Sequence, residues 1–331
     1  MSIPRVFVSR RIPKAGLDLL QHACELEVWP GELPPPAAVL REKSQDADGL
    51  LVLLTDRVDA ELLQLAKRLK VVSNFAVGVD NIDVAAATRR GVKIGNTPGV
   101  LTDATADCAV ALILAAGRKL VAGDRFAREG RWKTWEPTGH IGVDFVGKAI
   151  GVFGMGRIGF QVAKRCRFGW EMDVHFTNRS SNEWTSRAEK ELAAKRVEFD
   201  ELLATSDFVS VHAGLNDETR GLFSKEAFAR MRPTAVFVNT ARGGIVVESD
   251  LCDALERGVI FAAGLDVTDP EPPNPNSRLF QLDNVVVAPH MASATIQTRN
   301  RMAVTAAENL LAALEGRPMP SCVNLAALSK A

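Results

Sequence analysis

Short apolar runs rich in β-branched residues alternate with amphipathic segments along most of this chain. The apolar runs lie at residues 5–10, 49–54, 70–76, 149–154, 207–212, 234–239 and 284–288. Between them, residues 59–69, 157–166 and 249–258 carry apolar side chains at helical spacing. Strands that are buried on both faces are apolar throughout and are joined by helical crossovers, so this alternation predicts an α/β protein with parallel sheets.

Two proline-containing joints interrupt the pattern, at residues 96–99 (NTPG) and 288–290 (APH). Each precedes a helical stretch of about twenty residues that begins with helix-capping residue types. A chain of 331 residues is also too long for one ordinary α/β core. We therefore predict one domain from residues 1–99 and 290–331 and a second from residues 100–289, joined by a hinge. A single continuous sheet with ordinary loops is the alternative.

The charge balance and the cysteine content limit the partners and the location of the protein. Forty basic and forty acidic side chains give a formal net charge of zero, so we expect neither nucleic acid nor an anionic membrane as a partner. The five cysteines lack CxxC spacing, which indicates neither a disulfide framework nor a metal site. No leader-like or membrane-spanning apolar run follows Met1. We expect a cytoplasmic protein that acts on a small molecule.

The strongest chemical signal is a glycine-rich turn between a predicted strand and a predicted helix. It reads Gly154-Met155-Gly156-Arg157-Ile158-Gly159 and directly follows the apolar run AIGVF. The first glycine permits a tight turn, the second lets backbone approach a pyrophosphate, and the third allows close packing of the helix. Such a turn also occurs without a ligand. The strand before it, the helix after it and the next strand at the expected distance favour a dinucleotide cofactor.

Three residues at the end of that next strand bear on which dinucleotide binds. An NAD enzyme places an acid there on the ribose 2′-hydroxyl, whereas this chain has Asn178, Arg179 and Ser180. A neutral asparagine does not repel a 2′-phosphate, and arginine and serine can donate hydrogen bonds to one. We therefore predict that NADPH is preferred and that NADH is accepted less well. The alternative is that Arg179 simply points into solvent.

Three further polar residues follow the later apolar runs. Arg242 lies in the sequence NTARGG at the carboxyl end of a predicted strand, where ligands of open α/β sheets bind. A guanidinium at that place can hold a carboxylate. Glu271 lies in a proline-rich loop, and His290 lies at the start of a predicted helix. Taken singly, Arg242 is as well explained as a surface residue and His290 as a cap or core residue.

The motifs taken together resemble the D-isomer-specific 2-hydroxyacid dehydrogenase family, and within it the glyoxylate/hydroxypyruvate reductases, some of which also reduce 2-ketogluconate. In order they are VGVDNID (77–83), NTPGVLTDATAD, the glycine-rich turn, NTARGG, GLDVTDPEPP and PHMASAT (289–295). The resemblance implies two Rossmann-like or flavodoxin-like domains with parallel sheets and an active-site cleft between them. It also implies a nicotinamide-dependent reduction of a small 2-keto acid. Met291 and Ala292 depart from the usual isoleucine and glycine.

The resemblance assigns Arg242 as the substrate-binding arginine, His290 as the acid/base and Glu271 as the partner of that histidine. Hydride transfer to a keto carbon leaves an alkoxide that needs a proton, which an imidazolium can supply near neutral pH. A carboxylate within hydrogen-bond reach stabilises the imidazolium and fixes its tautomer. The arginine anchors the substrate carboxylate and stabilises the charge that develops on the carbonyl oxygen.

The resemblance also implies the remaining contacts of substrate and cofactor. Backbone amides of Val77 and Gly78 would hold the substrate carboxylate, and Leu53 would line the pocket. The predicted cofactor contacts are Thr105, Gly154, Met155, Gly156, Arg157, Ile158, Gly159, Asn178, Arg179, Ser180, Thr240, Ala241, Asp266 and His290.

The segment at residues 119–147 has no clear periodicity and carries Trp132 and Trp135. Two exposed tryptophans would be a costly apolar surface, so we expect both in the contact of a homodimer. The resemblance implies that Trp135 reaches the substrate pocket of the neighbouring subunit.

Two other functions use the same scaffold. A nucleotide-sensing corepressor would be expected to carry a docking extension or a long disordered tail, whereas this chain stops at Ala331 soon after its last predicted helix. A 3-phosphoglycerate dehydrogenase would be expected to carry extra basic residues near Val77, where AVGVDNID supplies only acids. We therefore favour a keto acid without a phosphate group, whose identity the sequence leaves open.

Overall fold

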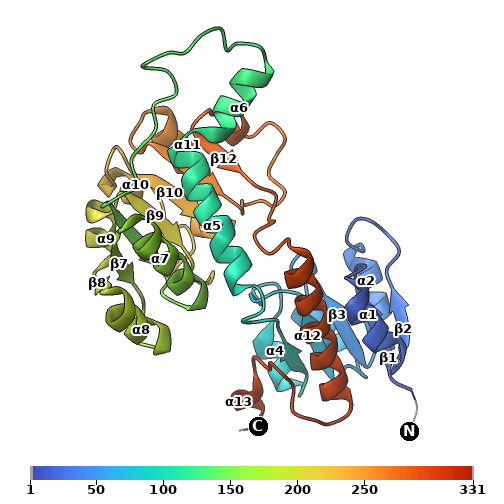
Figure 1. Ribbon diagram of the computed structural model, residues 1–331. Coiled ribbons are helices and arrows are strands. Elements are labelled where there is room, and N and C mark those ends of the chain that lie inside the picture. The colour runs from blue at the N-terminus through green and yellow to red at the C-terminus, as the bar shows by residue number, and fades with distance from the viewer. Residues whose placement is uncertain (1–2, 330–331) are drawn as a thin grey trace. The chain divides into compact units, whose positions relative to one another are not determined.

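The computed structural model describes residues 3–329, and its internal contacts divide the chain into two compact units. Unit 1 comprises Met1–Leu101 and Ala294–Ala331, and unit 2 comprises Thr102–Ser293. The predicted boundaries at residues 99 and 290 lie close to these divisions, and residues 1–2 and 330–331 of the predicted first domain lie outside the described residues. Each unit is built on one parallel sheet with helices on its faces (Figure 1), as the apolar runs predict.

Unit 1 has a five-stranded sheet of order β2-β1-β3-β4-β5, which is the flavodoxin-like order. Its strands are β1 (Arg5–Val8), β2 (Glu25–Val28), β3 (Gly49–Val52), β4 (Val71–Asn74) and β5 (Lys93–Gly95). Its helices are α1 (Lys14–Gln21), α2 (Ala37–Gln45), α3 (Ala60–Leu65), α4 (Val84–Arg89), α12 (Ile296–Leu314) and α13 (Leu325–Leu328). Every residue of β3 and β4 is buried, as expected for strands that are covered on both faces.

Helix α12 comes from the last part of the chain and packs against α1, β3 and β4. A Cβ atom at Gly16 of α1 would come within 2.5 Å of the Ala303 carbonyl oxygen, so glycine allows the two helices to approach closely. The hydroxyl of Ser73 in β4 donates a hydrogen bond of 2.9 Å to the Ala306 carbonyl. Unit 1 is therefore completed by a helix that is distant in sequence from the strands it covers.

Unit 2 has a seven-stranded parallel sheet of order β12-β11-β10-β9-β6-β7-β8. Its strands are β6 (Ala149–Phe153), β7 (Asp173–Thr177), β8 (Lys195–Arg196), β9 (Phe208–Val211), β10 (Val236–Asn239), β11 (Ala262–Leu265) and β12 (Val285–Val287). Counted from β6, the first six strands follow the Rossmann order, in which the direction of winding reverses between β6 and β9. Ligands of such sheets bind outside the carboxyl ends of the strands at this reversal.

The helices of unit 2 form two apolar layers against its sheet. One core cluster contains side chains of α5, α7 and α8, and the other contains side chains of α9, α10 and α11. Their bounds are α5 (Thr102–Gly117), α6 (Leu120–Arg128), α7 (Arg157–Trp170), α8 (Glu183–Leu192), α9 (Phe199–Thr205), α10 (Lys225–Arg230) and α11 (Glu248–Glu256), with short 3-10 turns η1 (Gly243–Ile245) and η2 (Arg278–Gln281). Within residues 3–329, no helix is both long enough and apolar enough to cross a membrane.

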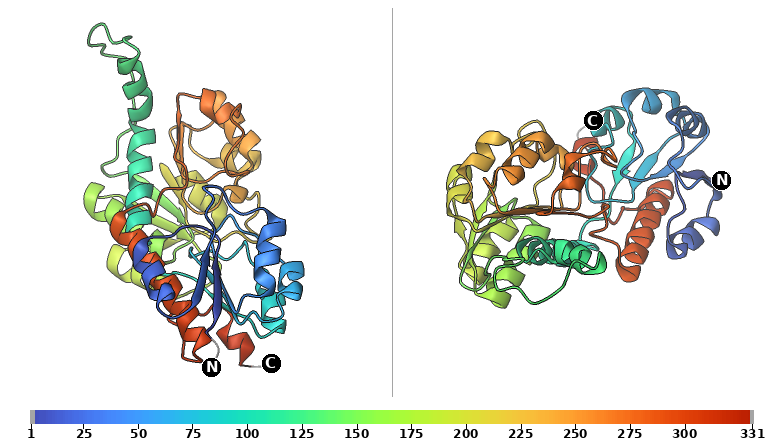
Figure 2. Two further views of the ribbon diagram at one scale, coloured as in Figure 1. Left: turned by 90° about the vertical axis from the view of Figure 1, so that its right-hand side faces the viewer. Right: turned by 90° about the horizontal axis from the view of Figure 1, so that it is seen from above.

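Residues 120–140, here called the arm, extend from the end of α5 away from the sheet of unit 2 (Figures 1 and 2). None of these residues is buried, and the side chains of Trp132 and Trp135 are 69% and 80% exposed. The prediction of an aperiodic segment was incomplete, because the arm begins with α6. Helix α6 is amphipathic although none of its residues is buried, so the interpretation of this stretch as aperiodic overlooked a helical pattern.

Candidate functional site

The glycine-rich turn joins β6 to α7 in a conformation that requires two of its glycines. Gly154 has a φ of +99°, and a Cβ atom there would lie 2.6 Å from the Ala213 amide nitrogen. A Cβ atom at Gly159 would overlap the Gly154 carbonyl oxygen. Gly156, by contrast, faces open space, because a Cβ atom there would meet no other atom within 4 Å. The amino terminus of α7 is therefore open to an anion, and a pyrophosphate fits this place.

The other residues of the turn connect it to the core and to the end of β7. Met155 is fully buried, Arg157 is the first residue of α7, and the partly buried Ile158 packs against the core. The Met155 amide donates a 3.0 Å hydrogen bond to the side-chain oxygen of Asn178. The side-chain nitrogen of Asn178 donates in turn to the Ser180 carbonyl at 2.6 Å. Asn178 thus braces the turn against the segment that follows β7.

A cavity of about 540 Å³ opens at the carboxyl ends of β6, β7, β8 and β9. This is the place where the winding of the sheet reverses and where cofactors of such sheets bind. Its lining combines glycines of the turn with four charged side chains. The lining residues are Phe153, Gly154, Gly156, Thr177, Asn178, Arg179, Ser180, Arg196, Val197, Glu198, His212, Ala213, Gly214, Asn216, Glu218 and Thr219.

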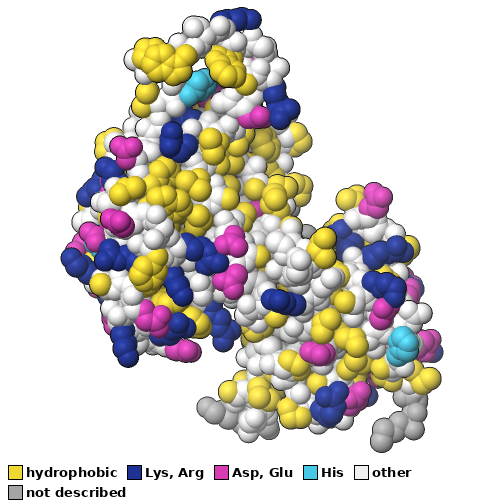
Figure 3. Space-filling model, viewed as in Figure 1, with side chains coloured by type: hydrophobic (Ala, Val, Ile, Leu, Met, Phe, Trp, Pro, Cys, Tyr) yellow, Lys and Arg dark blue, Asp and Glu magenta, His cyan; other side chains and the backbone are white. Residues whose placement is uncertain are grey.

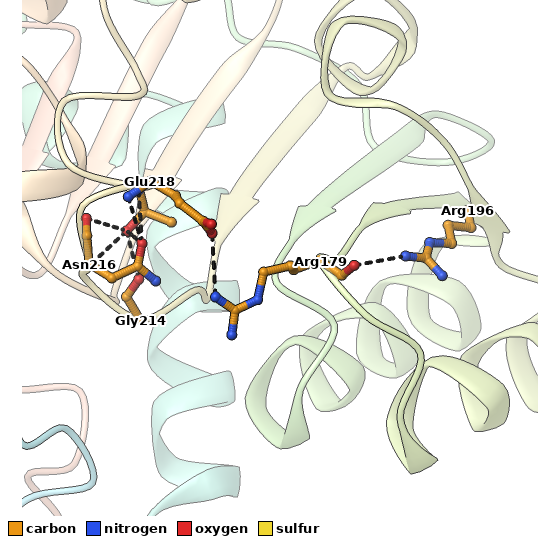
Figure 4. Close-up of polar contacts among 6 residues, drawn as sticks. Arg179, Arg196, Gly214, Asn216 and Glu218 are labelled. Carbon is orange, nitrogen blue, oxygen red and sulfur yellow. Dashed lines mark hydrogen bonds and ion pairs between the residues drawn. The ribbon is translucent and has the colours of Figure 1, made fainter.

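Arg179 does not point only into solvent at the edge of this cavity. Its guanidinium lies 3.4 Å from the carboxylate of Glu218, which comes from the loop after β9 (Figure 4). A second arginine, Arg196 of β8, also lines the cavity and donates to the carbonyl of Asn178 at 2.6 Å. Neither Arg196 nor Glu218 is among the predicted site residues. Both belong to loops or very short strands that carry no recognisable motif.

His212 lies between the cavity and β10 as a neutral imidazole. Burial lowers the pKa of His212 to about 3. Its Nε2 lies 2.8 Å from the Ser210 hydroxyl, and its Nδ1 lies 3.5 Å from the hydroxyl of Thr240. Thr240 is largely buried, and the Ala241 amide beside it is bonded to a side chain of β10. His212 is therefore an uncharged group in the lining of the cavity.

The loop after β10 holds Arg242 against a second loop of unit 2. The side chain of Asn239 donates to the Arg242 carbonyl at 2.9 Å, and the guanidinium of Arg242 donates to the Ala241 carbonyl at 2.8 Å. A Cβ atom at Gly243 would overlap the Thr268 carbonyl group, so these two stretches of backbone touch. Arg242 is thereby positioned beside the loop that leads to Glu271.

His290 and Glu271 form a direct hydrogen bond. Nδ1 of His290 lies 2.5 Å from Oε1 of Glu271, and the two side chains are 22% and 32% exposed. Because Nδ1 faces the carboxylate, Nε2 is the ring nitrogen that remains for a substrate. The structure therefore brings together two of the three residues predicted to carry the chemistry, from segments nineteen residues apart.

Asp266 holds the backbone around His290. Its carboxylate is 1% exposed and accepts hydrogen bonds from the amides of Met291 at 2.8 Å and Ala292 at 2.9 Å. Its carbonyl accepts from the His290 amide at 2.9 Å. Burial raises the pKa of Asp266, although these two amides act in the opposite direction. A predicted cofactor contact is thus also the residue that fixes the histidine segment.

The prediction that His290 begins a helix was wrong. Helix α12 begins at Ile296, with the side chain of Thr295 as its cap. His290 has a φ of +51°, a left-handed conformation, so it is not itself part of a right-handed helix. The physical reason is that Asp266 captures the amides that follow the histidine and bends the chain away from helical geometry.

In unit 1, hydrogen bonds fix the loop that contains Leu53. The Leu53 amide donates to the carboxylate of Asp56 at 2.7 Å, and the same carboxylate accepts from the Ser9 hydroxyl at 2.5 Å. The side chain of Asn81 donates to the Leu53 carbonyl at 3.0 Å. Leu53 is therefore held at the carboxyl end of β3 from two sides.

The backbone of Val77 and Gly78 is fixed in the same unit. The side chain of Asn96 donates to the Val77 carbonyl at 2.8 Å, and the side chain of Asn74 donates to the Gly78 carbonyl at 2.8 Å. Because both carbonyls are bound, the direction of the neighbouring peptide groups is set as well. These residues follow β4, beside the loop that follows β3.

The two remaining predicted residues lie in α5 and in the arm. Thr105 belongs to the first half of α5 and is buried, whereas Trp135 is an exposed residue of the arm. For the part of the chain that the structure describes, no group of three or more histidine, cysteine, aspartate or glutamate side chains is placed to hold a metal ion.

Comparison with known proteins places this chain among dehydrogenases. Residues 110–292 match the family described as D-isomer specific 2-hydroxyacid dehydrogenase, NAD binding domain. A glyoxylate reductase of Korarchaeum cryptofilum is 47% identical over 322 residues, which cover 97% of this chain and 96% of that protein.

Solved structures agree over nearly the whole chain. A protein of Thermus thermophilus is 44% identical with a TM-score of 0.89, and the match covers 96% of this chain and 99% of that chain. The NADPH-dependent glyoxylate/hydroxypyruvate reductase of Sinorhizobium meliloti, solved with NADP and malonate, is 29% identical with a TM-score of 0.85. That match covers 97% of both chains. The similarity extends over both units.

Proposed function

The chain belongs to the D-isomer specific 2-hydroxyacid dehydrogenase family, and from that premise we propose that it reduces small 2-keto acids to D-2-hydroxy acids. Glyoxylate and hydroxypyruvate are the proposed substrates, with 2-ketogluconate as a larger candidate. NADPH is the proposed preferred cofactor, and NADH the weaker one. The observation that carries the proposal is the hydrogen bond between His290 and Glu271 at the carboxyl edge of the cofactor-binding sheet.

His290 is the proposed acid of the reduction. A bound nicotinamide supplies hydride to the keto carbon. Nε2 of the imidazolium gives a proton to the oxygen that becomes the hydroxyl group, while Nδ1 stays bonded to Glu271. The carboxylate stabilises the protonated ring and fixes its orientation, because an imidazolium donates from both nitrogens. In the reverse reaction the neutral ring accepts the proton through the same nitrogen.

Arg242 is the proposed anchor of the substrate. A guanidinium can bind the carboxylate of the keto acid with two parallel hydrogen bonds and also stabilise negative charge on the carbonyl oxygen. The contact of Gly243 with the Thr268 backbone supports this role, because it couples the Arg242 loop to the loop that carries Glu271. A change in either loop is therefore expected to disturb both residues.

The remaining proposed contacts divide between the units. In unit 1, the amides of Val77 and Gly78 hold the substrate carboxylate, and Leu53 lines the pocket. In unit 2, the glycine-rich turn holds the pyrophosphate at the amino terminus of α7. The other proposed cofactor contacts are Thr105, Met155, Arg157, Ile158, Asn178, Arg179, Ser180, Thr240, Ala241, Asp266 and His290.

NADPH preference is proposed from the end of β7. Asn178 carries no charge and uses its side chain to brace the glycine-rich turn, so it does not repel a 2′-phosphate. Arg179 and Ser180 line the same cavity and can donate to the phosphate oxygens. Arg196 adds a second positive charge to the lining. This arrangement supports a phosphorylated ribose at the edge of the cavity.

The arm is the proposed contact of a homodimer. Hydrophobic side chains gather at its tip (Figure 3), and Trp132 and Trp135 line a cavity of about 330 Å³ there with Phe126 and His140. Exposed aromatics of this size are typical of a protein interface. We expect the wild-type chain to sediment as a dimer at micromolar concentration and the double variant Trp132→Ser, Trp135→Ser to sediment as a monomer. Phe168→Ser, an exposed aromatic of α7 outside the arm, is the control and should remain dimeric.

The activity is tested by oxidation of NADPH and NADH with a panel of keto acids. The panel contains glyoxylate, hydroxypyruvate, pyruvate, 2-ketogluconate and 3-phosphohydroxypyruvate. Highest kcat/KM with glyoxylate or hydroxypyruvate, and a D-configured product, is the expected result. Highest efficiency with 3-phosphohydroxypyruvate would establish a phosphoglycerate dehydrogenase instead. Cofactor binding without turnover of any member would favour a nucleotide-sensing role.

A further inference from the structure

Glu218 lies opposite Arg179 at the edge of the cofactor cavity. Its Oε2 is 3.4 Å from a terminal nitrogen of Arg179, and both side chains line the cavity (Figure 4). The Arg179 side chain is 77% exposed and that of Glu218 is 69% exposed. An ion pair this exposed to water is weak and opens readily, so another anion can replace the carboxylate.

The backbone of Glu218 is held in place even though its side chain is exposed. The side-chain oxygen of Asn216 accepts hydrogen bonds from the amides of Glu218 at 2.9 Å and Thr219 at 3.1 Å. The hydroxyl of the buried Thr219 donates to the Gly214 carbonyl at 2.8 Å. These bonds order the loop after β9, so the carboxylate of Glu218 can turn about its own side-chain bonds but stays at the cavity edge.

Arg196 fixes the opposite side of the cavity edge. Its guanidinium donates to the carbonyls of Asn178 and Arg179 at 2.6 and 3.5 Å, and to the hydroxyl of Ser181 at 3.1 Å. None of these three acceptors is charged, so the positive charge of Arg196 is still available to an anion in the cavity. The backbone that carries Arg179 is thereby held facing the Glu218 loop.

We propose that Glu218 is a specificity-determining residue that competes with the 2′-phosphate of NADPH for Arg179. The inference rests on the proposed function, because it assumes that Arg179 binds the 2′-phosphate. A phosphate at Arg179 brings negative charge close to the Glu218 carboxylate, and this repulsion weakens the binding of NADPH. The 2′-hydroxyl of NADH is uncharged and can donate a hydrogen bond to the same carboxylate.

In NAD enzymes an acid at the end of the second strand binds the ribose 2′-hydroxyl. Glu218 therefore takes the role of that acid, although it comes from a different loop. Arg179 favours the phosphorylated cofactor and Glu218 favours the unphosphorylated one. Because the two side chains neutralise each other, the discrimination between the cofactors is smaller than Arg179 alone would give.

The test compares Glu218→Gln with the matched control Asp217→Asn, which removes a carboxylate from the same loop but outside the cavity lining. Calorimetry measures the Kd of adenosine 2′,5′-bisphosphate and of AMP for each variant. We expect the Kd of the bisphosphate to fall about two- to fivefold in Glu218→Gln, as for loss of an exposed ion pair, with no such gain for AMP. The kcat/KM ratio of NADPH to NADH should rise by a similar factor.

Two further measurements show whether the effect acts through Arg179. Measured against Arg179→Ala, the gain in the double variant Arg179→Ala, Glu218→Gln should be smaller than the gain that Glu218→Gln gives in the wild-type background, and it should shrink at high ionic strength. Unchanged or weaker binding of the bisphosphate in Glu218→Gln, or an equal gain in Asp217→Asn, would overturn the inference. The single variant Arg179→Ala separates the two proposals. If Arg179→Ala lowers the kcat/KM ratio of NADPH to NADH while Glu218→Gln increases neither this ratio nor the affinity for the bisphosphate, only the present inference fails. If Arg179→Ala leaves the ratio unchanged, the proposed 2′-phosphate site fails.

Discussion

The catalytic corner, formed by Asp266, Glu271 and His290, and the cavity edge, formed by Arg179, Arg196 and Glu218, belong to the same unit but are held in different ways. In the corner, the carboxylate of Asp266 is 1% exposed and binds two backbone amides. At the cavity edge, the ion pair of Arg179 and Glu218 is more than two-thirds exposed. In the corner a buried carboxylate holds the backbone around His290, whereas the cavity edge is held by charges in contact with water.

Because the two regions are held so differently, substitutions in them should have different effects on the chemistry. Removing one partner of a buried bonded group leaves the other unsatisfied, which is costly, whereas exposed charge pairs contribute little to stability. We therefore expect substitutions in the catalytic corner to affect turnover with either cofactor. Substitutions at the cavity edge should change the choice of cofactor and leave turnover nearly intact.

The largest effect is expected for His290→Ala. Loss of a positioned general acid should lower kcat for reduction by about two to four orders of magnitude. Binding of the cofactor, measured by fluorescence titration, should be largely retained, because the glycine-rich turn is untouched. Near-normal turnover would contradict the assignment of His290 as the general acid, and the proton would then have to come from outside the catalytic corner.

Glu271→Gln should have a smaller effect. Glutamine keeps a hydrogen bond to Nδ1 but carries no charge, so it stabilises the proton-donating imidazolium less well than the carboxylate does. A hydrogen bond to a charged group contributes about 1 to 1.5 kcal/mol more than a neutral one, so we expect kcat for reduction to fall about tenfold. Cofactor binding should be unchanged. A kcat close to that of the wild type would show that the hydrogen bond of 2.5 Å has no catalytic role.

The smallest effect on turnover is expected for Arg179→Ala. The ratio of kcat/KM for NADPH to that for NADH should fall about tenfold, since a charge-assisted hydrogen bond to phosphate contributes about 1.5 to 3 kcal/mol. The kcat values at saturating cofactor should remain close to those of the wild type. If kcat with both cofactors fell as far as in His290→Ala, the cavity edge would also be needed for catalysis, and the two regions would not differ in function.

Much of the fold follows directly from local sequence. The apolar runs predicted most strands of both sheets, because a strand that is covered on both faces is apolar along its whole length and is easy to recognise. The glycine-rich turn is also local, since Gly154 and Gly159 are needed for backbone geometry that other residues cannot adopt. The strand β8 is only two residues long and shows no such pattern, and α6 was missed because its amphipathic stretch of nine residues lies in an otherwise aperiodic segment.

Residues of the site could be predicted only where they belong to a recognisable sequence motif. Glu271 and His290 were paired through the resemblance, and nothing in their spacing shows that their side chains meet. The left-handed conformation of His290 depends on bonds to Asp266, which lies 24 residues earlier in the chain. Arg179 follows β7 and Glu218 follows β9, and the two strands end close together because each is a neighbour of β6 in the sheet. The contact therefore depends on the strand order, which local sequence does not show.

The late position of α12 in the chain has a consequence for synthesis on the ribosome. The strands of unit 1 emerge first, but the helix that packs on β3 and β4 emerges only after the whole of unit 2. The contiguous stretch Thr102–Ser293 can therefore complete its core while one face of the first sheet still lacks its cover. We therefore expect unit 1, whose strands are translated first, to complete its fold last. Until α12 emerges, the apolar face of β3 and β4 stays exposed, and a chaperone can bind it.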